Sequence, residues 1–134
     1  MNEPFWIEKA ALLLVHGQVL AEHGGLEGIR DEGLLESALA RPKNLYAYEG
    51  VEDLPRLAVS YAAGILRNHP FADGNKRMAF IALSLFLARN GSQLQADPLE
   101  AGRTFWAAAT GELHEEDLVA WVVKNIVADP QKKT

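Results

Sequence analysis

Cysteine is absent from the sequence, which excludes disulfide bonds, a catalytic thiol and a zinc site built from thiolates. A membrane-spanning run is absent as well. The longest apolar stretch, residues 78–88, is interrupted by Ser84, and a membrane helix needs about 20 apolar residues. The first four residues, MNEP, have neither the basic start nor the apolar stretch of a secretory signal. We therefore expect a cytoplasmic protein that does not associate with a membrane.

An excess of positive charge is also missing. The net charge is −5 and the calculated isoelectric point is near 5.3, whereas a domain that binds nucleic acid usually carries a basic surface. Direct contact with nucleic acid is therefore not expected, although a small basic pocket remains possible. The length of 134 residues and a hydrophobic content of 49% fit one compact domain. We expect that domain to span residues 1–134, with a frayed polar tail at 129–134.

Glycine and proline fall between segments rather than within them, and almost every segment has the apolar period of a helix. The helix at 75–90 has almost no polar face, which is typical of the buried centre of a domain. The sequence predicts an all-α bundle of about six helices around this central helix. The predicted helices cover residues 7–23, 31–42, 55–68, 75–90, 97–111 and 115–127.

The segment from 44 to 52 lacks a helical period and follows Pro42, which is expected to close the second helix. Tyr46 and Tyr48 alternate along it, as side chains do along an exposed strand. We expect this segment to form a short extended flap that holds a target protein by adding it as a strand.

The nine residues at 69–77, HPFADGNKR, are the most informative part of the chain. Pro70 disfavours helical backbone at His69, so the preceding helix should end there. Lys76 and Arg77 then fall in the first turn of the next helix, where unpaired N–H groups normally attract acidic side chains. Two cations there are locally unfavourable unless they bind an anion, and helix N-termini are natural phosphate sites. The alternative is that both side chains simply extend into solvent.

Each polar residue of the motif has a chemical and a structural interpretation. His69 can act as a general base near neutral pH, or it can merely end its helix. Asp73 can hold Mg²⁺ against phosphate oxygens, or it can cap the next helix. Gly74 allows a close backbone approach to a ligand, and Asn75 can cap or hydrogen-bond. Arg77 offers a bidentate fork to phosphate.

The remaining histidines carry weaker signals. His16 and His23 are seven residues apart and share a helix face, so a two-histidine metal site is conceivable. A role as hydrogen-bonded polar residues or as cleft lining is favoured. His114 lies between two predicted helices and is expected at the surface.

The motif HPFADGNKR resembles the signature of the Fic/Doc family, whose Fic branch carries HPFxxGNGR. The lysine before the final arginine is similar to the Doc (death-on-curing) branch of toxin–antitoxin toxins. The resemblance extends over nearly the whole chain. It includes HGGLEGIRDEGLLESALARP near the N-terminus and AAATGELHEEDLVAW near the C-terminus.

The resemblance implies roles for individual residues. His69 matches the catalytic base and Asp73 matches the Mg²⁺ ligand. Gly74, Asn75 and Arg77 match the cradle that binds the phosphates of a nucleotide.

Two further positions distinguish the branches of the family. Lys76 stands where the Fic pattern has a glycine. In the Doc branch, this lysine accompanies a nucleotide that binds in the inverted orientation. Arg67 matches an arginine that precedes the base in the Doc branch. The second arginine of the longer Fic motif is absent, with Phe80 at its place, and no internal inhibitory motif is present.

The resemblance therefore implies a toxin that uses ATP and Mg²⁺ to transfer the γ-phosphoryl group to a Ser or Thr hydroxyl of a protein. Elongation factor Tu is the substrate associated with the Doc branch, so inhibition of translation is the expected effect. A separate antitoxin whose C-terminal segment binds in a groove is the expected inhibitor. Two alternatives stay open: a Fic-type nucleotidyltransferase, which Pro70 fits, and a catalytically silent co-regulator that only binds an antitoxin.

Overall fold

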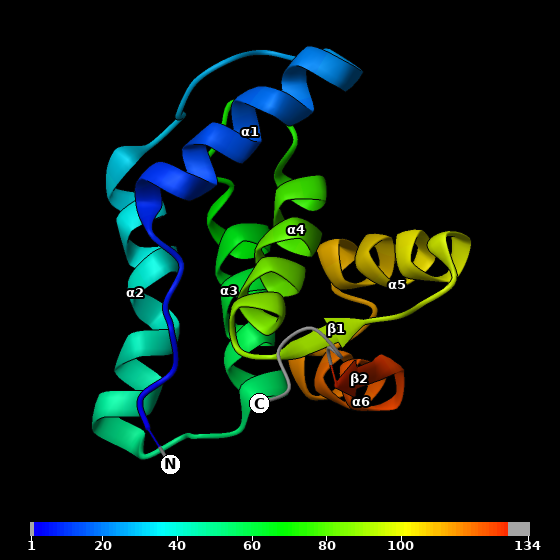
Figure 1. Ribbon diagram of the computed structural model, residues 1–134. Helices are drawn as coiled ribbons and strands as arrows, with labels where there is room; N and C mark the ends of the chain where they lie inside the picture. The colour runs from blue at the N-terminus through cyan, green and yellow to red at the C-terminus, as the bar shows by residue number, and fades with distance from the viewer. Residues whose placement is uncertain (1, 129–134) are drawn as a thin grey trace.

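The computed structural model describes residues 2–128 and shows a bundle of helices with one small two-stranded ribbon (Figure 1). The all-α bundle predicted from the sequence is confirmed. Strands β1 (Ser92–Leu94) and β2 (Ile126–Ala128) pair antiparallel, with Gln93 opposite Val127. The helices are α1 (Lys9–His23), α2 (Glu32–Glu49), α3 (Leu54–Asn68), α4 (Asn75–Arg89), α5 (Pro98–Thr110) and α6 (Glu115–Asn125).

Most helices begin and end at the signals that the sequence carries. The side chain of Asp31 accepts a hydrogen bond from the Leu34 N–H at 2.9 Å. Asp97 accepts one from the Glu100 N–H at 3.1 Å, so both aspartates act as N-caps. Pro55 lies in the first turn of α3, where its missing N–H costs nothing.

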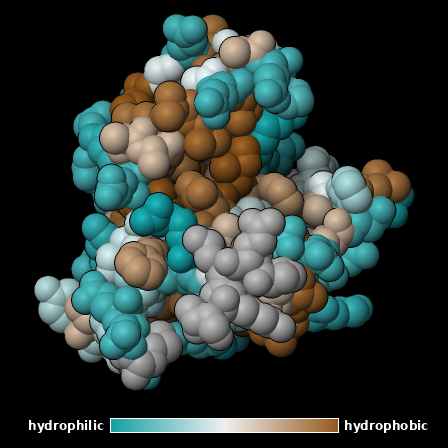
Figure 2. All heavy atoms as spheres, viewed as in Figure 1, coloured by the Kyte–Doolittle hydropathy of each residue, from teal (hydrophilic) through white to brown (hydrophobic). Residues whose placement is uncertain are grey.

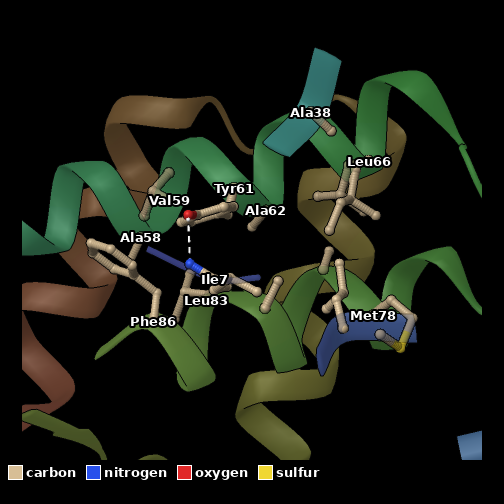
Figure 3. Packing of buried hydrophobic residues seen from close by; sticks show 14 of the residues in the cluster. Ile7, Ala38, Ala58, Val59, Tyr61, Ala62, Leu66, Met78, Leu83 and Phe86 are labelled. Atoms are coloured by element: carbon tan, nitrogen blue, oxygen red, sulfur yellow. Dashed lines mark hydrogen bonds between the residues drawn. The ribbon is translucent and has the colours of Figure 1, made fainter. Parts of the chain in front are cut away.

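The centre of the bundle is formed by α3 and α4 packed against each other (Figure 3). Every residue from 57 to 66 of α3 is buried. On α4, Leu83 and Phe86 are fully buried, whereas Phe80 is only partly buried. The sequence pattern predicted that α4 forms the centre of the bundle, and the structure shows that α3 shares this position.

A buried hydrogen bond ties the N-terminal arm to this centre. The Ile7 N–H donates to the Tyr61 hydroxyl at 3.1 Å (Figure 3). Burial raises the pKa of the Tyr61 hydroxyl, and the hydrogen bond from Ile7 partly offsets that increase. Gly64 lets α2 approach α3 closely, because a Cβ there would lie 3.1 Å from the Cα of Ala38.

The extended flap predicted at residues 44–52 is wrong in position. Helix α2 continues through Pro42 to Glu49 and ends at Gly50, whose φ of 69° is left-handed. Pro42 is buried inside the helix, and Tyr46 packs edge-on against Trp6 with ring centroids 5.7 Å apart. Tertiary packing therefore outweighs the roughly 3 kcal/mol that an internal proline costs a helix. The short flap of this fold is instead the β1–β2 ribbon.

The last predicted helix is two residues too long, because α6 ends at Asn125 and residues 126–128 form β2. The predicted tail at 129–134 lies outside the described residues. Within residues 2–128, no helix combines the length and the hydropathy that crossing a membrane requires.

Candidate functional site

The loop that joins α3 to α4 begins at a strained residue. His69 has φ 46° and ψ 56°, and within residues 2–128 it is the single non-glycine residue with positive φ. Its N–H still donates to the Ile65 carbonyl at 3.0 Å, so the helix ends at His69 as predicted. Backbone strain of this kind is held in place by surrounding structure and concentrates at functional sites. The His69 side chain is exposed, so this residue ends the helix and presents its ring to solvent.

An arginine that sequence analysis missed holds this conformation. Arg30 donates from Nε to the His69 carbonyl and from Nη2 to the Asn68 carbonyl, both at 2.7 Å. The backbone N–H groups of Arg30 and Asp31 donate to the Pro70 carbonyl at 2.7 and 3.1 Å. The segment before α2 therefore clamps the loop. No local pattern in the sequence marks Arg30, since its partners are backbone carbonyls distant along the chain.

Phe71 and Asn75 close the loop from inside. The Phe71 ring is fully buried and stacks on His16 with ring centroids 4.2 Å apart. The Asn75 side chain accepts from the Phe71 N–H and donates to the Phe71 carbonyl, both at 3.0 Å. Phe71 therefore anchors the loop in the hydrophobic core. Asn75 uses one donor and one acceptor of its side chain on the loop, which leaves its backbone N–H and the second hydrogen of its amide group for a ligand.

Asp73 lies exposed on the loop, with its position fixed by several hydrogen bonds. Its Oδ1 accepts from the Gly74 N–H at 2.9 Å and its Oδ2 accepts from the Leu26 N–H at 3.3 Å. The buried His16 places its Nε2 3.0 Å from the Asp73 carbonyl oxygen. Gly25 allows this packing, because a Cβ there would lie 3.0 Å from Asp73 Oδ2. Asp73 does not cap α4 through its side chain, since Gly74 is the N-cap.

The remaining histidines take the roles that the sequence favoured. His16 is a hydrogen-bonded buried residue beneath the site. His23 is exposed and lies 3.7 Å from a carboxylate oxygen of Glu22. Among the described residues, no three His, Asp or Glu side chains gather as a metal cluster. His114 is exposed at the start of α6.

Lys76 and Arg77 stand exposed in the first turn of α4, which contains no acidic residue. Across residues 2–128, neither side chain forms an ion pair with a carboxylate. The N-cap residue Gly74 has no side chain to satisfy the first N–H groups of the helix. This end of α4 therefore combines unpaired N–H groups with two unpaired cations, which favours a bound anion.

The structure places Arg67 apart from this pair of cations. Its Nη2 lies 3.2 Å from an oxygen of Glu115, and Glu115 also receives two hydrogen bonds from Arg41 at 2.9 and 3.0 Å. Arg67 faces α6, whereas Lys76 and Arg77 line a hollow beside α5. Sequence analysis missed Arg41 and Glu115, because nothing local connects residues so far apart in the chain.

Comparison with known proteins agrees with this geometry. The sequence model of the Fic/DOC family matches residues 6–87, which include the whole loop and α4 up to Leu87. The chain belongs to the Fic/DOC family. It is 37% identical over 107 residues to protein kinase doc of Escherichia phage P1, covering 80% of this chain and 84% of that protein. It is 46% identical over 78 residues to toxin Doc of Mycolicibacterium smegmatis, covering 55% of this chain and 58% of that protein.

The family assignment confirms the resemblance found in the sequence. The family match ends before α5 and α6, so the hollow beside α5 and the Arg41–Glu115 pair involve residues outside the matched region. The relatives named as a toxin and as a protein kinase indicate which chemistry to test in this chain.

Proposed function

We propose that this protein is a Doc-type toxin that transfers the γ-phosphoryl group of ATP to a Ser or Thr hydroxyl of a cytoplasmic protein. The observation that carries the proposal is the N-terminal end of α4. There, two unpaired cations and unpaired N–H groups directly follow the loop that carries an exposed histidine and an exposed carboxylate. Phosphoryl transfer depends mainly on positioning and charge stabilisation, which such a site supplies.

His69 is the proposed general base. Arg30 holds the backbone of His69 in one conformation, so the Cα from which the exposed imidazole extends has a fixed position. The base accepts the proton of the incoming hydroxyl as that oxygen attacks the γ-phosphorus, and the bond from this phosphorus to the β–γ bridging oxygen breaks to release ADP. Such a base contributes about 10²- to 10⁴-fold in rate. Arg77 and Lys76 neutralise the phosphate charge, and Arg77 can do so through two parallel hydrogen bonds.

Asp73 fits the proposed role of Mg²⁺ ligand. Each carboxylate oxygen accepts one backbone N–H and retains lone pairs, and the group is exposed. Magnesium bound to phosphates commonly uses one or two carboxylates from the protein. When bound, the ion would neutralise charge on the phosphates. The hydrogen bonds from Leu26 and Gly74 keep the carboxylate oriented before the nucleotide arrives.

Lys76 decides between the kinase and the nucleotidyltransferase. A glycine at this position lets the backbone approach the phosphates, whereas lysine adds bulk and a point charge. The decisive experiment offers ATP labelled at either the α or the γ position to a bacterial lysate. We expect protein labelling from the γ label alone, and no labelling with His69→Ala. Labelling from the α position would establish the nucleotidyltransferase, and Lys76→Gly should shift the product in that direction.

Elongation factor Tu is the proposed acceptor, and the support is the resemblance to the Doc branch. The purified factor should become labelled from γ-labelled ATP, and mass spectrometry should locate the phosphate on a Ser or Thr. If another protein of the lysate takes the label while the purified factor does not, the target is wrong and the kinase assignment stands. No transfer to any protein would favour the catalytically silent co-regulator.

A cognate antitoxin is the proposed inhibitor, and its C-terminal segment is proposed to bind in a groove. Hydrophobic residues gather on the face between α1 and α4 (Figure 2). Leu14 on α1 is 67% exposed, and Ile81 lies one turn beyond Arg77 on α4. A segment bound along this face would end beside the site. Leu14→Lys should weaken antitoxin binding, whereas Val123→Lys on α6, also at an exposed apolar residue, should not; equal effects would place the antitoxin elsewhere.

A further inference from the structure

A histidine lies buried in the face that α1 turns towards the core. The buried residues of α1 are Leu12, His16, Val19 and Leu20, which have the spacing of one helix face. His16 is 4% exposed, and the other three positions carry aliphatic side chains. An apolar residue would fill this place without the cost of removing an imidazole from water. Packing alone therefore gives no reason for a histidine at this position.

The imidazole of His16 contacts the loop at three residues. Its ring stacks on Phe71, with centroids 4.2 Å apart and ring planes inclined by 25°. Its Nε2 lies 3.0 Å from the carbonyl oxygen of Asp73. A Cβ on Gly74 would lie 3.9 Å from the same nitrogen. Because a carbonyl oxygen can only accept, Nε2 carries the hydrogen and donates it. His16 therefore supports the loop from below, at the point where the loop turns into α4.

The peptide that joins Asp73 to Gly74 links this buried contact to the exposed carboxylate. The carbonyl of this peptide accepts from His16, and its N–H donates to Asp73 Oδ1 at 2.9 Å. The peptide is trans and planar, so its C=O and N–H point in opposite directions. A hydrogen bond that fixes the carbonyl from inside the protein therefore also fixes the N–H on the other side. That N–H holds one oxygen of the carboxylate.

Gly74 makes this peptide easy to rotate. Its φ is 79°, and glycine adopts positive and negative φ about equally readily. A flip of the peptide changes mainly ψ of Asp73 and φ of Gly74, so it meets little steric resistance. The flipped peptide would withdraw its N–H from Oδ1 and turn its carbonyl oxygen towards the carboxylate. It would also turn an N–H towards the Nε2 hydrogen of His16, and the two donors would then oppose each other.

We propose that His16 is a positioning residue for Mg²⁺ binding, because it holds the Asp73–Gly74 peptide in one orientation and thereby orients the Asp73 carboxylate. This proposal rests on the proposed function, since it assumes that Asp73 binds the ion. The Leu26 N–H, 3.3 Å from Oδ2, holds the other oxygen of the carboxylate. Replacing a residue that orients a metal ligand commonly changes metal affinity or activity by about 10- to 100-fold.

The first test measures how much Mg²⁺ strengthens nucleotide binding. A non-hydrolysable ATP analogue is titrated by calorimetry, once with Mg²⁺ and once with EDTA, into the parent protein, His16→Phe, His16→Gln and Val19→Ala. Phenylalanine keeps a ring that can stack and removes the donor, whereas glutamine offers an N–H near the place of Nε2. Val19→Ala is the control that removes apolar packing from the same face of α1.

The parent should bind the analogue more tightly with Mg²⁺ than with EDTA. His16→Phe should weaken binding with Mg²⁺ about tenfold and leave binding in EDTA unchanged. His16→Gln should retain most of the affinity, and Val19→Ala should match the parent. If Val19→Ala weakened binding with Mg²⁺ as much as His16→Phe, the effect would come from general loosening of α1, and the positioning role would be overturned. Thermal melts show that each variant is folded.

The second test uses the protein without nucleotide or metal. NMR of the ¹⁵N-labelled imidazole should find the hydrogen of His16 on Nε2. Hydrogen exchange of the Gly74 amide should accelerate in His16→Phe and remain near the parent rate in His16→Gln and Val19→Ala. A hydrogen on Nδ1 alone, or unchanged exchange of Gly74 in His16→Phe, would overturn the proposal. The imidazole measurement needs no variant, so it can overturn the proposal even if His16→Phe does not fold.

The outcomes separate this proposal from the proposed function. If the parent transfers phosphate and His16→Phe binds the analogue with Mg²⁺ equally well, the positioning role is overturned and the proposed function stands. If Mg²⁺ does not strengthen binding of the analogue to the parent, the metal site of the proposed function fails and takes the role of His16 with it.

Discussion

The two ends of α4 differ in how their side chains suit the helix dipole and the free backbone groups of the helix. At its C-terminal end Arg89 complements the helix dipole, and the Asn90 side chain donates to the Phe86 carbonyl at 2.8 Å. Asn90 also bonds both backbone groups of Phe5, at 2.8 and 3.0 Å. At the N-terminal end, no side chain caps the helix and Lys76 opposes the dipole.

The difference separates an end of α4 that satisfies the rules of helix stability from an end that we propose binds a ligand. Asn75 and Asn90 are alike in making paired side-chain hydrogen bonds, so both ends are rigid. The two ends differ in the electrostatics of the helix terminus and in whether a side chain satisfies its free backbone groups. Departures from local rules of this kind are expected at functional sites. The account therefore predicts that activity and stability can be changed separately at the two ends.

The largest effect should come from removing the base at the N-terminal end. His69→Ala should reduce transfer of γ-labelled phosphate by about 10²- to 10⁴-fold. It should leave the free energy of unfolding nearly unchanged, because the side chain is exposed. Expression of the parent protein should arrest growth, and the same variant should relieve that arrest. A variant as toxic as the parent would show that toxicity does not depend on this base.

An intermediate effect should come from the two asparagine clamps. Asn75→Ala and Asn90→Ala each leave backbone partners without their hydrogen bonds, so each should lower the free energy of unfolding by about 1–3 kcal/mol. Asn75→Ala should also reduce the transfer rate, because the loop that carries His69 and Asp73 loosens. Urea unfolding and the labelling assay measure both quantities. An equal loss of activity in both variants would mean that the clamps act through overall stability alone.

The smallest effect should come from reversing charge at each end. Lys76→Glu should raise the free energy of unfolding by about 0.3–1 kcal/mol, and Arg89→Glu should lower it by a similar amount. Only Lys76→Glu should also reduce transfer, and by less than His69→Ala. Both stability changes should shrink at high salt, because the dipole interaction is screened. If Lys76→Glu destabilised the protein, the first turn of α4 would not be the electrostatic conflict that we describe.

The sequence allowed the bundle and the loop to be predicted because their determinants are local. Asp31, Asp97 and Pro55 act within one turn of their own positions, and the central motif is contiguous. Pro42 led to the wrong prediction that α2 ends there. The proline is buried inside a continuous helix, and no local pattern reveals the tertiary packing that stabilises it.

The supports of the site are non-local and were missed for that reason. Arg30 reaches backbone carbonyls 38 and 39 residues away in sequence. The Arg41–Glu115 pair, which lies beside Arg67 and apart from the loop, spans 74 residues and was missed for the same reason. A single sequence shows the chemical groups of the loop, whereas the residues that position them emerge only when the chain is folded.

The most direct test of the central claim is a crystal structure of the protein with Mg²⁺ and a non-hydrolysable ATP analogue. The account predicts phosphate density at the N-terminal end of α4, in contact with the N–H groups of the first turn and with Arg77. The terminal phosphate should lie nearest His69, with a metal ion on Asp73. Nucleotide density elsewhere, with this end of α4 empty, would contradict the account.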